Sequence, residues 1–368
     1  MTTFAWESFC NELGPAKIVH IYDPKTGLKA IVAVDNVACG PAIGGVRMAA
    51  DVTVEEVFRL ARAMTLKNAA AGLPHGGGKS GIIAEPHTQE KESLVRSFAR
   101  AIRDLRDYIP GPDMGTDETC MAWVHDEIGR SVGLPRVLGG IPLDEIGATG
   151  YGVAQCGEVA AEFCDLDLKG ARVAIEGFGN VGRPAARFLE EKGAVLVAAG
   201  DSRGAVYDPD GIPVEKLIEV KRQTGRVTSY DRGRTLSHEE LLTVDCDILV
   251  PAARPDCIHA GNAAEIRAKL ILEGANIPST PAAEDVLYQR GILLVPDFIA
   301  NAGGVICASV EYGGGSEAQA LQLIDEKIRR NTREVLTLSR AKSMPPRHAA
   351  EMMAVERVRA AMALRQRV

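Results

Sequence analysis

The sequence predicts an α/β protein of two domains, an N-terminal α/β domain followed by a doubly wound parallel sheet. The chain has 368 residues, which is long for a single hydrophobic core. From about residue 145, apolar runs of strand length alternate with helical segments, a pattern typical of parallel sheets. We therefore expect a domain boundary near residue 145.

Composition argues for a cytoplasmic protein that binds small molecules. The formal net charge of −7 does not favour nucleic acid or an anionic membrane as the main partner. No apolar run approaches the length of a membrane span, and the N-terminus lacks a signal-peptide pattern. The 8 cysteines are scattered without a CxxC pair, and the 7 histidines show no metal-binding spacing. We predict reduced thiols and no metal site.

The first domain should begin with two strands and a helix. Residues 17–23 and 29–36 are alternating or apolar and end in turn residues. A helix is expected from Thr53, which would be its N-cap with Glu56 as the capping-box partner, and it should end at Gly72. We expect a short buried strand and then an amphipathic helix to follow, at residues 81–86 and 93–109.

The second domain should repeat a strand–helix unit. The predicted helices cover residues 149–164 and 181–193, on either side of a strand at 171–179. Further apolar runs of strand length occupy residues 194–202, 245–253, 269–276 and 292–298. Beyond about residue 316 the chain is mostly helical and rich in arginine.

The segment GFGNVG, residues 177–182, predicts a dinucleotide site of the Rossmann type. Gly177, Gly179 and Gly182 would form a tight turn and place a pyrophosphate on a helix N-terminus. Asp201 ends the next strand, where an acid holds the adenosine ribose hydroxyls. We expect NAD; Arg203 could attract a 2′-phosphate, so NADP remains open. The alternative is a tight turn without a cofactor.

A second glycine-rich segment, GGGKS at residues 76–80, does not fit a phosphate-binding loop. That motif would require glycine at position 73, which is Leu73, and a helix after the loop, whereas here a helix precedes it. Lys67 lies one turn after Met64 on the apolar face of that helix, although a lysine can also snorkel from the edge of such a face. Two lysines joined by a glycine-rich turn can meet in one cleft.

In such a cleft, a positive neighbour and partial burial would lower the pKa of one amine and make it a general base. One of the two lysines would take this role, and the other, kept charged, would suit a substrate carboxylate. We expect the glycines to leave space beside the amine of Lys79. Asp113 lies in a Pro- and Gly-rich loop, residues 111–118. Alone it would be a turn residue, but beside two lysines it suggests proton transfer.

Together these segments resemble the glutamate/leucine/phenylalanine/valine dehydrogenase family. The resemblance includes GPAIGGVRM (40–48), MTLKNAAAGLPHGGGKSGI (64–82), PGPDMGTDE (110–118), ATGYGV (148–153), EGFGNVG (176–182), DILVPAA (247–253), EGAN (273–276) and NAGGV (301–305). It covers roughly residues 30–312 in order, and the double-lysine motif is its most specific part.

The resemblance implies an oxidoreductase that uses NAD(P) for the reversible oxidative deamination of an L-amino acid to its 2-oxo acid and ammonia. It implies that Lys67 binds the substrate α-carboxylate, that Lys79 activates water and that Asp113 shuttles protons. The positions implied near the cofactor, besides the three glycines, are Thr149, Asn180, Val181, Asp201, Ser202, Arg203, Ala252, Ala253 and Asn276. The resemblance implies a catalytic and oligomerisation domain, residues 1–145 together with about 318–368, and a Rossmann domain, residues 146–317. It also implies an active site in the cleft between them and a closed homo-oligomer.

Two positions favour an apolar substrate. Glutamate dehydrogenases carry a lysine for the side-chain carboxylate where this chain has Ile43, and a serine where it has Ala308. The motif resembles the leucine/valine/phenylalanine branch, so we predict a branched-chain or aromatic substrate contacted also by Gly44, Met64 and Val305.

Other possibilities stay open at this point. Arg254 follows DILVPAA, and it could pair with an acidic substrate such as glutamate or with a cofactor phosphate, or point to solvent. A non-catalytic NAD-binding paralogue is a further alternative, although such a protein would not need Lys67, Lys79 and Asp113.

Overall fold

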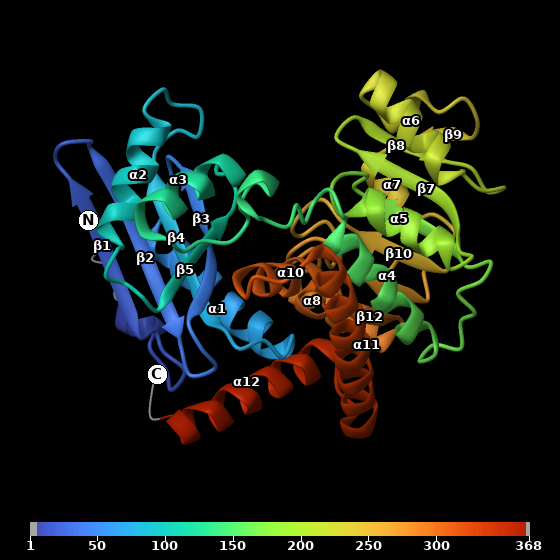
Figure 1. The fold of residues 1–368 in the computed structure, drawn as a ribbon. Coiled ribbons are helices and arrows are strands. Elements are labelled where there is room, and N and C mark those ends of the chain that lie inside the picture. The colour runs from blue at the N-terminus through green and yellow to red at the C-terminus, as the bar shows by residue number, and fades with distance from the viewer. Residues whose placement is uncertain (1–5, 366–368) are drawn as a thin grey trace. The chain divides into compact units, whose positions relative to one another are not determined.

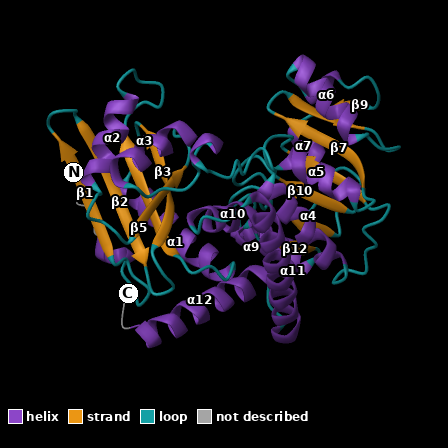
Figure 2. Ribbon diagram, in the orientation of Figure 1, coloured by secondary structure: helices purple, strands orange, loops and turns teal. Residues whose placement is uncertain are grey.

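The computed structural model describes residues 6–365, which form two compact units (Figures 1 and 2). Unit 1 comprises Met1–Pro142, Val305–Gln319 and Glu351–Val368; unit 2 comprises Leu143–Gly304 and Ala320–Ala350. The C-terminal part differs from the expected division, because residues 320–350 belong with the second sheet and 305–319 with the first.

Unit 1 contains a five-stranded mixed sheet in the order β1-β2-β4-β3-β5. Its strands are β1 (Lys17–Asp23), β2 (Leu28–Asn36), β3 (Ala42–Ala49), β4 (Gly76–Ile83) and β5 (Tyr108–Pro112). β2 pairs antiparallel with β1 and β4, whereas β3 runs parallel to β4 and β5. β4 is therefore an interior strand, and both of its edges are paired.

Helices cover both faces of this sheet. Successive residues of β2 alternate between two cores: Val32 and Val34 pack with α2, whereas Ile31 and Ala33 pack with α1. The helical segments of unit 1 are η1 (Trp6–Phe9), α1 (Val54–Ala70), α2 (Lys91–Ala101), α3 (Glu118–Ile128) and η2 (Arg136–Leu138). Because both faces are buried, β2 and β4 consist mainly of apolar residues and glycine.

The N-cap prediction for α1 is confirmed. The Thr53 side chain accepts a hydrogen bond from the backbone N–H of Glu56 at 3.2 Å. The Glu56 carboxylate pairs with Arg47. Gly72, with a φ of 67°, ends the helix in a left-handed conformation.

Two predicted elements of unit 1 are wrong. The glycines at 76–78 are not a turn but the first residues of β4, where Gly77 pairs with both Asn36 of β2 and Ile43 of β3. The helix expected over 93–109 ends at Ala101, because Tyr108 starts β5 and pairs with Ala42. Pairing between strands that are distant in the sequence overrides the local pattern at both places.

Unit 2 contains a seven-stranded sheet in the order β12-β11-β10-β6-β7-β8-β9. Its strands are β6 (Arg172–Glu176), β7 (Val195–Asp201), β8 (Gly204–Tyr207), β9 (Arg234–Leu236), β10 (Ile248–Pro251), β11 (Leu270–Leu272) and β12 (Leu293–Val295). Five strands are parallel, which confirms the doubly wound prediction. The antiparallel strands β8 and β9 were not predicted.

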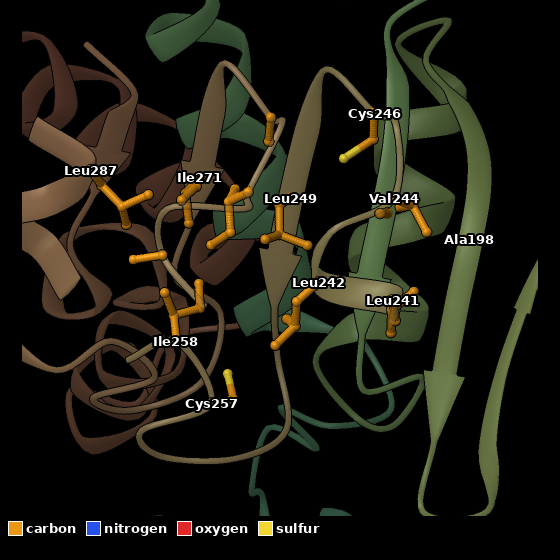
Figure 3. Packing of buried hydrophobic residues seen from close by; sticks show 14 of the residues in the cluster. Ala198, Leu241, Leu242, Val244, Cys246, Leu249, Cys257, Ile258, Ile271 and Leu287 are labelled. Carbon is orange, nitrogen blue, oxygen red and sulfur yellow. The ribbon is translucent and has the colours of Figure 1, made fainter. Parts of the chain in front are cut away.

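The sheet of unit 2 carries helices on both faces and a core of small and branched side chains (Figure 3). The helical segments are α4 (Ala148–Ala161), α5 (Gly182–Glu191), α6 (Val214–Thr224), η3 (Val227–Ser229), α7 (His238–Leu242), α8 (Pro281–Gln289), α9 (Asp297–Ala300) and α11 (Glu317–Lys342). Two further helices, α10 (Gly303–Tyr312) and α12 (Pro346–Arg365), have residues in both units, as does α11, whose residues 317–319 belong to unit 1.

The position of α11 has a physical reason. Arg329 donates to Gln155 and Glu158 of α4, and Arg333 forms two hydrogen bonds with Glu162. These contacts attach the first half of the arginine-rich C-terminal part to the second sheet. The family resemblance predicts instead that this part belongs with the first sheet.

Candidate active site

The α1-facing side of the unit 1 sheet presents a row of residues around Lys79. Side chains alternate along a strand, so Gly77, Lys79 and Gly81 of β4 point to the same face. On β3, Ile43 pairs with Gly77 and Arg47 pairs with Gly81, which places Gly45 beside Lys79. A Cβ atom added to Gly45 would lie only 3.2 Å from Lys79 Nζ. The space next to the amine therefore depends on this glycine.

Lys79 is the centre of a chain of alternating charges. Its side chain is nearly buried, and Nζ lies 3.0 Å from Oδ2 of Asp113. The same oxygen accepts from Arg47 Nε at 2.8 Å, and Arg47 pairs in turn with Glu56 of α1. Thr116 fixes the loop that carries Asp113, since its hydroxyl donates to the carbonyl of Val46 at 2.7 Å.

The pKa of Lys79 is lowered from its ordinary value. Burial is the largest cause, because it disfavours the charged amine. The neighbouring Asp113 opposes this effect by stabilising the ammonium form, Arg47 adds to the lowering, and Glu56 weakly opposes it. The positive neighbour identified here is Arg47, whereas the sequence suggested Lys67. A lysine in this environment can release and take up a proton nearer to neutral pH than an exposed one.

The three glycines before Lys79 serve packing, which corrects the expectation that they leave space for a substrate. A Cβ on Gly76 would lie 1.8 Å from the carbonyl oxygen of Asn36, and one on Gly77 would lie 2.1 Å from the backbone nitrogen of Thr65 in α1. A Cβ on Gly78 would meet the ring of Tyr108 at 2.8 Å. These glycines let a helix, a loop and an aromatic ring approach β4.

The other expected substrate contacts also lie in unit 1 or at its edge. Met64 and Lys67 are half-buried on α1, one helical turn apart, and Val305 is half-buried on α10. Gly44 has no room for a side chain, because its Cβ would lie 1.6 Å from the oxygen of Gly78. Its carbonyl accepts a hydrogen bond from the hydroxyl of Tyr108 at 2.9 Å.

Ile43 and Ala308 meet in one apolar cluster, together with Ile109 and Val132. Ile43 lies two residues before Gly45 on β3, so its side chain is on the same face as Lys79. Next to Ala308, the hydroxyl of Ser309 is 3.0 Å from Nε2 of His75. Burial lowers the pKa of His75, so this imidazole is largely neutral at pH 7.

In unit 2, the three fingerprint glycines have three different environments. Gly177 has a φ of 102°, which only glycine adopts readily, and its Cβ would meet Ala253. A Cβ on Gly182 would lie 1.9 Å from the oxygen of Gly177, so it permits the close approach of α5. Around Gly179 there is nothing within 4 Å. This open backbone fits the approach of a dinucleotide pyrophosphate.

The sheet order supports the same location. The chain continues from β6 through β7 to one side, and β10 then lies on the other side of β6. Such a reversal opens a crevice at the carboxyl ends of the parallel strands, where open α/β sheets bind ligands. Gly177, Asp201 and Ala252 all lie at or directly after these strand ends.

Asp201 has a more enclosed environment than a ribose-binding acid requires. Its side chain is 5% exposed. One carboxylate oxygen accepts from the backbone N–H of Arg203 at 2.9 Å and the other from that of Val227 at 2.8 Å. Lys221 Nζ lies 3.5 Å from the second oxygen and donates to the carbonyl of Phe178. Its contact with ribose hydroxyls therefore stays a prediction.

The remaining expected cofactor positions differ in exposure, and their contact with a dinucleotide stays a prediction. Ser202, Arg203, Asn180, Ala253 and Asn276 are exposed, whereas Thr149, Val181 and Ala252 are half-buried. The Asn180 side chain donates to Asp144 at 2.9 Å. The Asn276 amide oxygen accepts from Asn301 at 3.0 Å.

Arg254 is not a free loop residue. Its Nε lies 3.3 Å from a carboxylate oxygen of Glu176, the buried residue that ends β6, while 56% of its side chain is exposed. Within unit 2 this arginine thus already has an acidic partner.

Sequence reasoning missed Arg47, Glu56, Gly45 and Lys221. Arg47 and Gly45 belong to the segment GPAIGGVRM. If this segment had been recognised as a strand, the alternation of side chains would have placed both residues on the same face as Ile43. The other two depend on contacts between separate elements and leave no local signal.

The described part of the chain, residues 6–365, contains no group of three or more His, Cys, Asp or Glu side chains that could hold a metal ion. None of its helices is long and apolar enough to cross a membrane.

Comparison with known proteins agrees with this geometry. The family model for glutamate/leucine/phenylalanine/valine dehydrogenase matches residues 139–366, and the model for the Glu/Leu/Phe/Val dehydrogenase dimerisation domain matches residues 15–130. A glutamate dehydrogenase of Aeropyrum pernix is 44% identical over 355 residues, which are 90% of this chain and 85% of the relative.

Two solved structures share the fold. The hetero-hexameric glutamate dehydrogenase of Thermus thermophilus, in its leucine-bound form, has a TM-score of 0.84 and 32% identity over 95% of this chain and 90% of that one. The L-tryptophan dehydrogenase of Nostoc punctiforme has a TM-score of 0.78 and 26% identity over 97% of this chain and 99% of that one.

The relatives include both an NADP-specific and an NAD-specific glutamate dehydrogenase. Matching family models over most of the chain and a relative with 44% identity over 90% of it establish the family. The chain belongs to the glutamate/leucine/phenylalanine/valine dehydrogenase family and is an NAD(P)-dependent oxidoreductase that acts on the CH–NH₂ group of an amino acid.

Proposed function

We propose that Lys79 is the general base in the oxidative deamination of an L-amino acid. The observation that carries this proposal is a nearly buried amine of lowered pKa that touches one carboxylate and adjoins a glycine-made space. A bound NAD(P)⁺ would supply the hydride acceptor that converts the amino acid to the imino acid. Lys79 takes a proton from water as the water oxygen attacks the imino carbon, and it then returns this proton to the nitrogen. The C–N bond breaks and ammonia leaves, while the hydroxyl proton passes through Lys79 and Asp113 to solvent and the C=O bond of the 2-oxo acid forms.

Asp113 serves as the proton relay in this scheme. Its carboxylate is 3.0 Å from Lys79 Nζ and its side chain is 22% exposed, so it links the buried amine to solvent. Because Arg47 holds the same oxygen, the carboxylate stays oriented toward the amine during turnover. Lys67, half-buried on α1, supplies the positive charge for the substrate α-carboxylate.

We propose further that the substrate side chain is apolar. Ile43, Ile109, Val132 and Ala308 form a buried cluster on the face that carries Lys79. A carboxylate placed here would lose its hydration, and the neutral imidazole of His75 would not compensate its charge. A branched or aromatic side chain incurs no such cost.

Glutamate is the second candidate, and the names of the relatives support it more directly. The Aeropyrum pernix and Thermotoga maritima relatives, at 44% and 40% identity, are both glutamate dehydrogenases. In that case a cation from outside the apolar cluster would have to bind the distal carboxylate. Arg254 is paired with Glu176, so it would first have to leave that partner.

A substrate panel separates these candidates. Formation of NADH and NADPH should be measured with leucine, valine, phenylalanine, tryptophan and glutamate, and compared as kcat/KM. We expect the highest value for an apolar amino acid. A higher kcat/KM for glutamate would exclude the apolar assignment, and turnover of none would favour a non-catalytic paralogue.

A matched pair of variants tests the pocket itself. Ile43→Lys introduces the cation that the apolar cluster lacks and should raise kcat/KM for glutamate while lowering that for the apolar substrate. Ile43→Val removes one methylene without adding charge and should change both values in the same direction. Thermal unfolding of each variant shows whether the fold is kept.

The assembly of the chain is also a proposal. The Thermus thermophilus relative is described as hetero-hexameric. We propose that this chain likewise acts as an oligomer, built from its own copies. Sedimentation of the purified protein would measure this directly.

A further inference from the structure

Four charged side chains of unit 2 meet where β11 and β12 end. Glu273 directly follows β11, Asp297 begins α9 directly after β12, and Glu284 lies on α8. Arg347, in the first turn of α12, bonds to all three: Nη2 to Glu273 at 2.8 Å, Nε to Glu284 at 2.6 Å and Nη1 to Asp297 at 3.1 Å. One guanidinium thus holds three acids.

The cluster is buried and carries more acids than bases. The Glu273 side chain is 0% exposed, and that of Arg347 is 18% exposed. Oε1 of Glu273 has no hydrogen-bond partner. A fully ionised carboxylate in this position would leave one oxygen desolvated and unpaired, which is costly.

The cluster holds residues 273–277, the segment that contains the expected cofactor contact Asn276. The backbone N–H of Asp297 donates to Oε2 of Glu273, and the backbone N–H of Ile277 donates to Asp297, both at 2.9 Å. Asn301, four residues after Asp297, donates to the carbonyl of Ala275 and to the side chain of Asn276. The segment 273–277 is therefore held at its start by Glu273 and at its end by Asp297, and Arg347 bonds to both of these acids.

We propose that Arg347 is a positioning residue for the cofactor: by holding Glu273 and Asp297 together, it fixes residues 273–277 and so presents Asn276 to the dinucleotide. This inference rests on the proposed function only in that unit 2 binds the cofactor beside Asn276. Arg347 itself need not touch the cofactor or the substrate.

The charge state of Glu273 makes the inference testable by pH. Burial raises the pKa of Glu273 to about 8; Arg347 lowers it, while Asp297 and Glu284 raise it further. The other groups that face it are the hydroxyl of Ser279 and the thiol of Cys257, whose own pKa is raised to about 12 by burial, so that it stays neutral. Below about pH 8, the carboxyl group of Glu273 is thus mostly neutral.

Above this pH Glu273 ionises beside the Arg347 guanidinium, with one carboxylate oxygen buried and without a hydrogen-bond partner. A folded-state pKa above the unfolded value means that the stabilisation is complete below the unfolded pKa of 4.5 and lost as pH rises through about 8. The contacts of Arg347 and Glu273 that hold residues 273–277 should weaken as the pH rises through about 8, and the affinity for the cofactor should fall as well.

The test measures cofactor binding in the absence of an amino acid. The dissociation constants of NAD⁺ and NADP⁺ would be determined calorimetrically from about pH 6 to about pH 10 for the full-length protein. For whichever cofactor binds more tightly, we expect the constant to increase across pH 8. In Glu273→Gln, which is neutral at every pH, this step should disappear while the affinity at low pH is kept.

Arg347→Met should weaken binding by about fivefold or more at all pH values. Arg347→Lys should restore part of the loss, since one ammonium cannot bond to three carboxylates at once. Arg329→Met is the matched control, because Arg329 bonds to α4 in the same unit and should leave the dissociation constant and its pH step unchanged.

Two results would overturn the inference: a wild-type pH step in Glu273→Gln, or wild-type affinity in a folded Arg347→Met. If Arg347→Met does not fold by circular dichroism, Glu273→Gln alone decides the question. Failure of the amino-acid panel would leave this result untouched. A wild-type protein that binds neither cofactor would overturn the proposed function together with this inference.

Discussion

Two glycine-rich segments, GGGKS in unit 1 and GFGNVG in unit 2, look similar in sequence and do opposite things in the structure. In the first, the glycines at 76–78 lie inside a paired strand, and a Cβ on each would collide with protein atoms. In the second, Gly179 lies in a turn and nothing is within 4 Å of its missing Cβ. The glycines at 76–78 therefore make room for the protein itself, as do Gly177 and Gly182, whereas Gly179 leaves open backbone where we expect a dinucleotide.

The same contrast separates the chemistry of the two units. Unit 1 places a charged, titratable group on a rigid interior strand, where burial lowers the pKa of Lys79. Unit 2 presents open backbone at the carboxyl ends of parallel strands, where the peptide groups themselves can bind an anion. The count of glycines does not distinguish these cases; the atoms around each Cβ position do.

The largest expected effect comes from Lys79→Ala. Removal of the general base should lower kcat by about 10²–10⁴-fold, while the affinity for NAD⁺ stays at the wild-type value. Steady-state kinetics and calorimetric titration of the cofactor measure the two quantities. Loss of cofactor binding would show that the two glycine-rich segments do not have separate roles. Lys79→Arg keeps the charge beside Asp113 but cannot act as a base, so it should be equally inactive.

The second prediction compares glycines directly. Gly77→Ala should reduce the free energy of unfolding by about 1–3 kcal/mol or more, because its Cβ would lie 2.1 Å from a backbone nitrogen of α1. Gly179→Ala has open space and should leave stability unchanged but weaken cofactor binding. Denaturant unfolding and NAD⁺ titration of both variants provide the comparison. Equal stability losses would contradict the distinction drawn here.

A pair of opposite pH shifts tests the electrostatics of unit 1. Arg47→Met removes a cation that lowers the pKa of Lys79 and frees two acids, so this pKa should rise. The rise of kcat/KM with pH, which follows the free-base form of Lys79, should then move to higher pH. In Glu56→Gln, loss of an anion should move it to lower pH. Shifts in the same direction would be inconsistent with the charge chain described above.

The smallest effect is expected on the opposite face of the same sheet. Tyr108 bonds to Ser80 and to the carbonyl of Gly44, both at 2.9 Å. Tyr108→Phe should cost about 1 kcal/mol of stability, since it leaves a buried hydroxyl without a partner, and should not move the pH profile. A clear shift of that profile would mean that Tyr108 acts on Lys79 through the sheet.

Much of unit 2 could be predicted from the sequence, because its signals are local. Strand, turn and helix follow one another within residues 172–191, and the spacing of Gly177, Gly179 and Gly182 specifies the turn. The hairpin β8–β9 escaped prediction, since its strands are short and separated by 26 residues that include α6.

Unit 1 was harder to predict, and the reason is non-local pairing. The run GGGKSGII has low intrinsic strand preference, yet β2 and β3 supply hydrogen bonds on both of its edges. Tyr108, expected at the end of a helix, belongs instead to β5 because it pairs with Ala42 of β3.

By itself, the sequence determined the family and the class of reaction, and it is the source of the proposed site residues: Lys67, Lys79, Asp113 and the fingerprint glycines. These are recognised by residue type and spacing along the chain. The tertiary structure alone decided that Arg47 and Glu56 tune Lys79, that Asp201 is enclosed and that Arg347 joins three acids. Such contacts join elements that lie far apart in the sequence, and their energies depend on burial and distance, which exist only once the chain has folded.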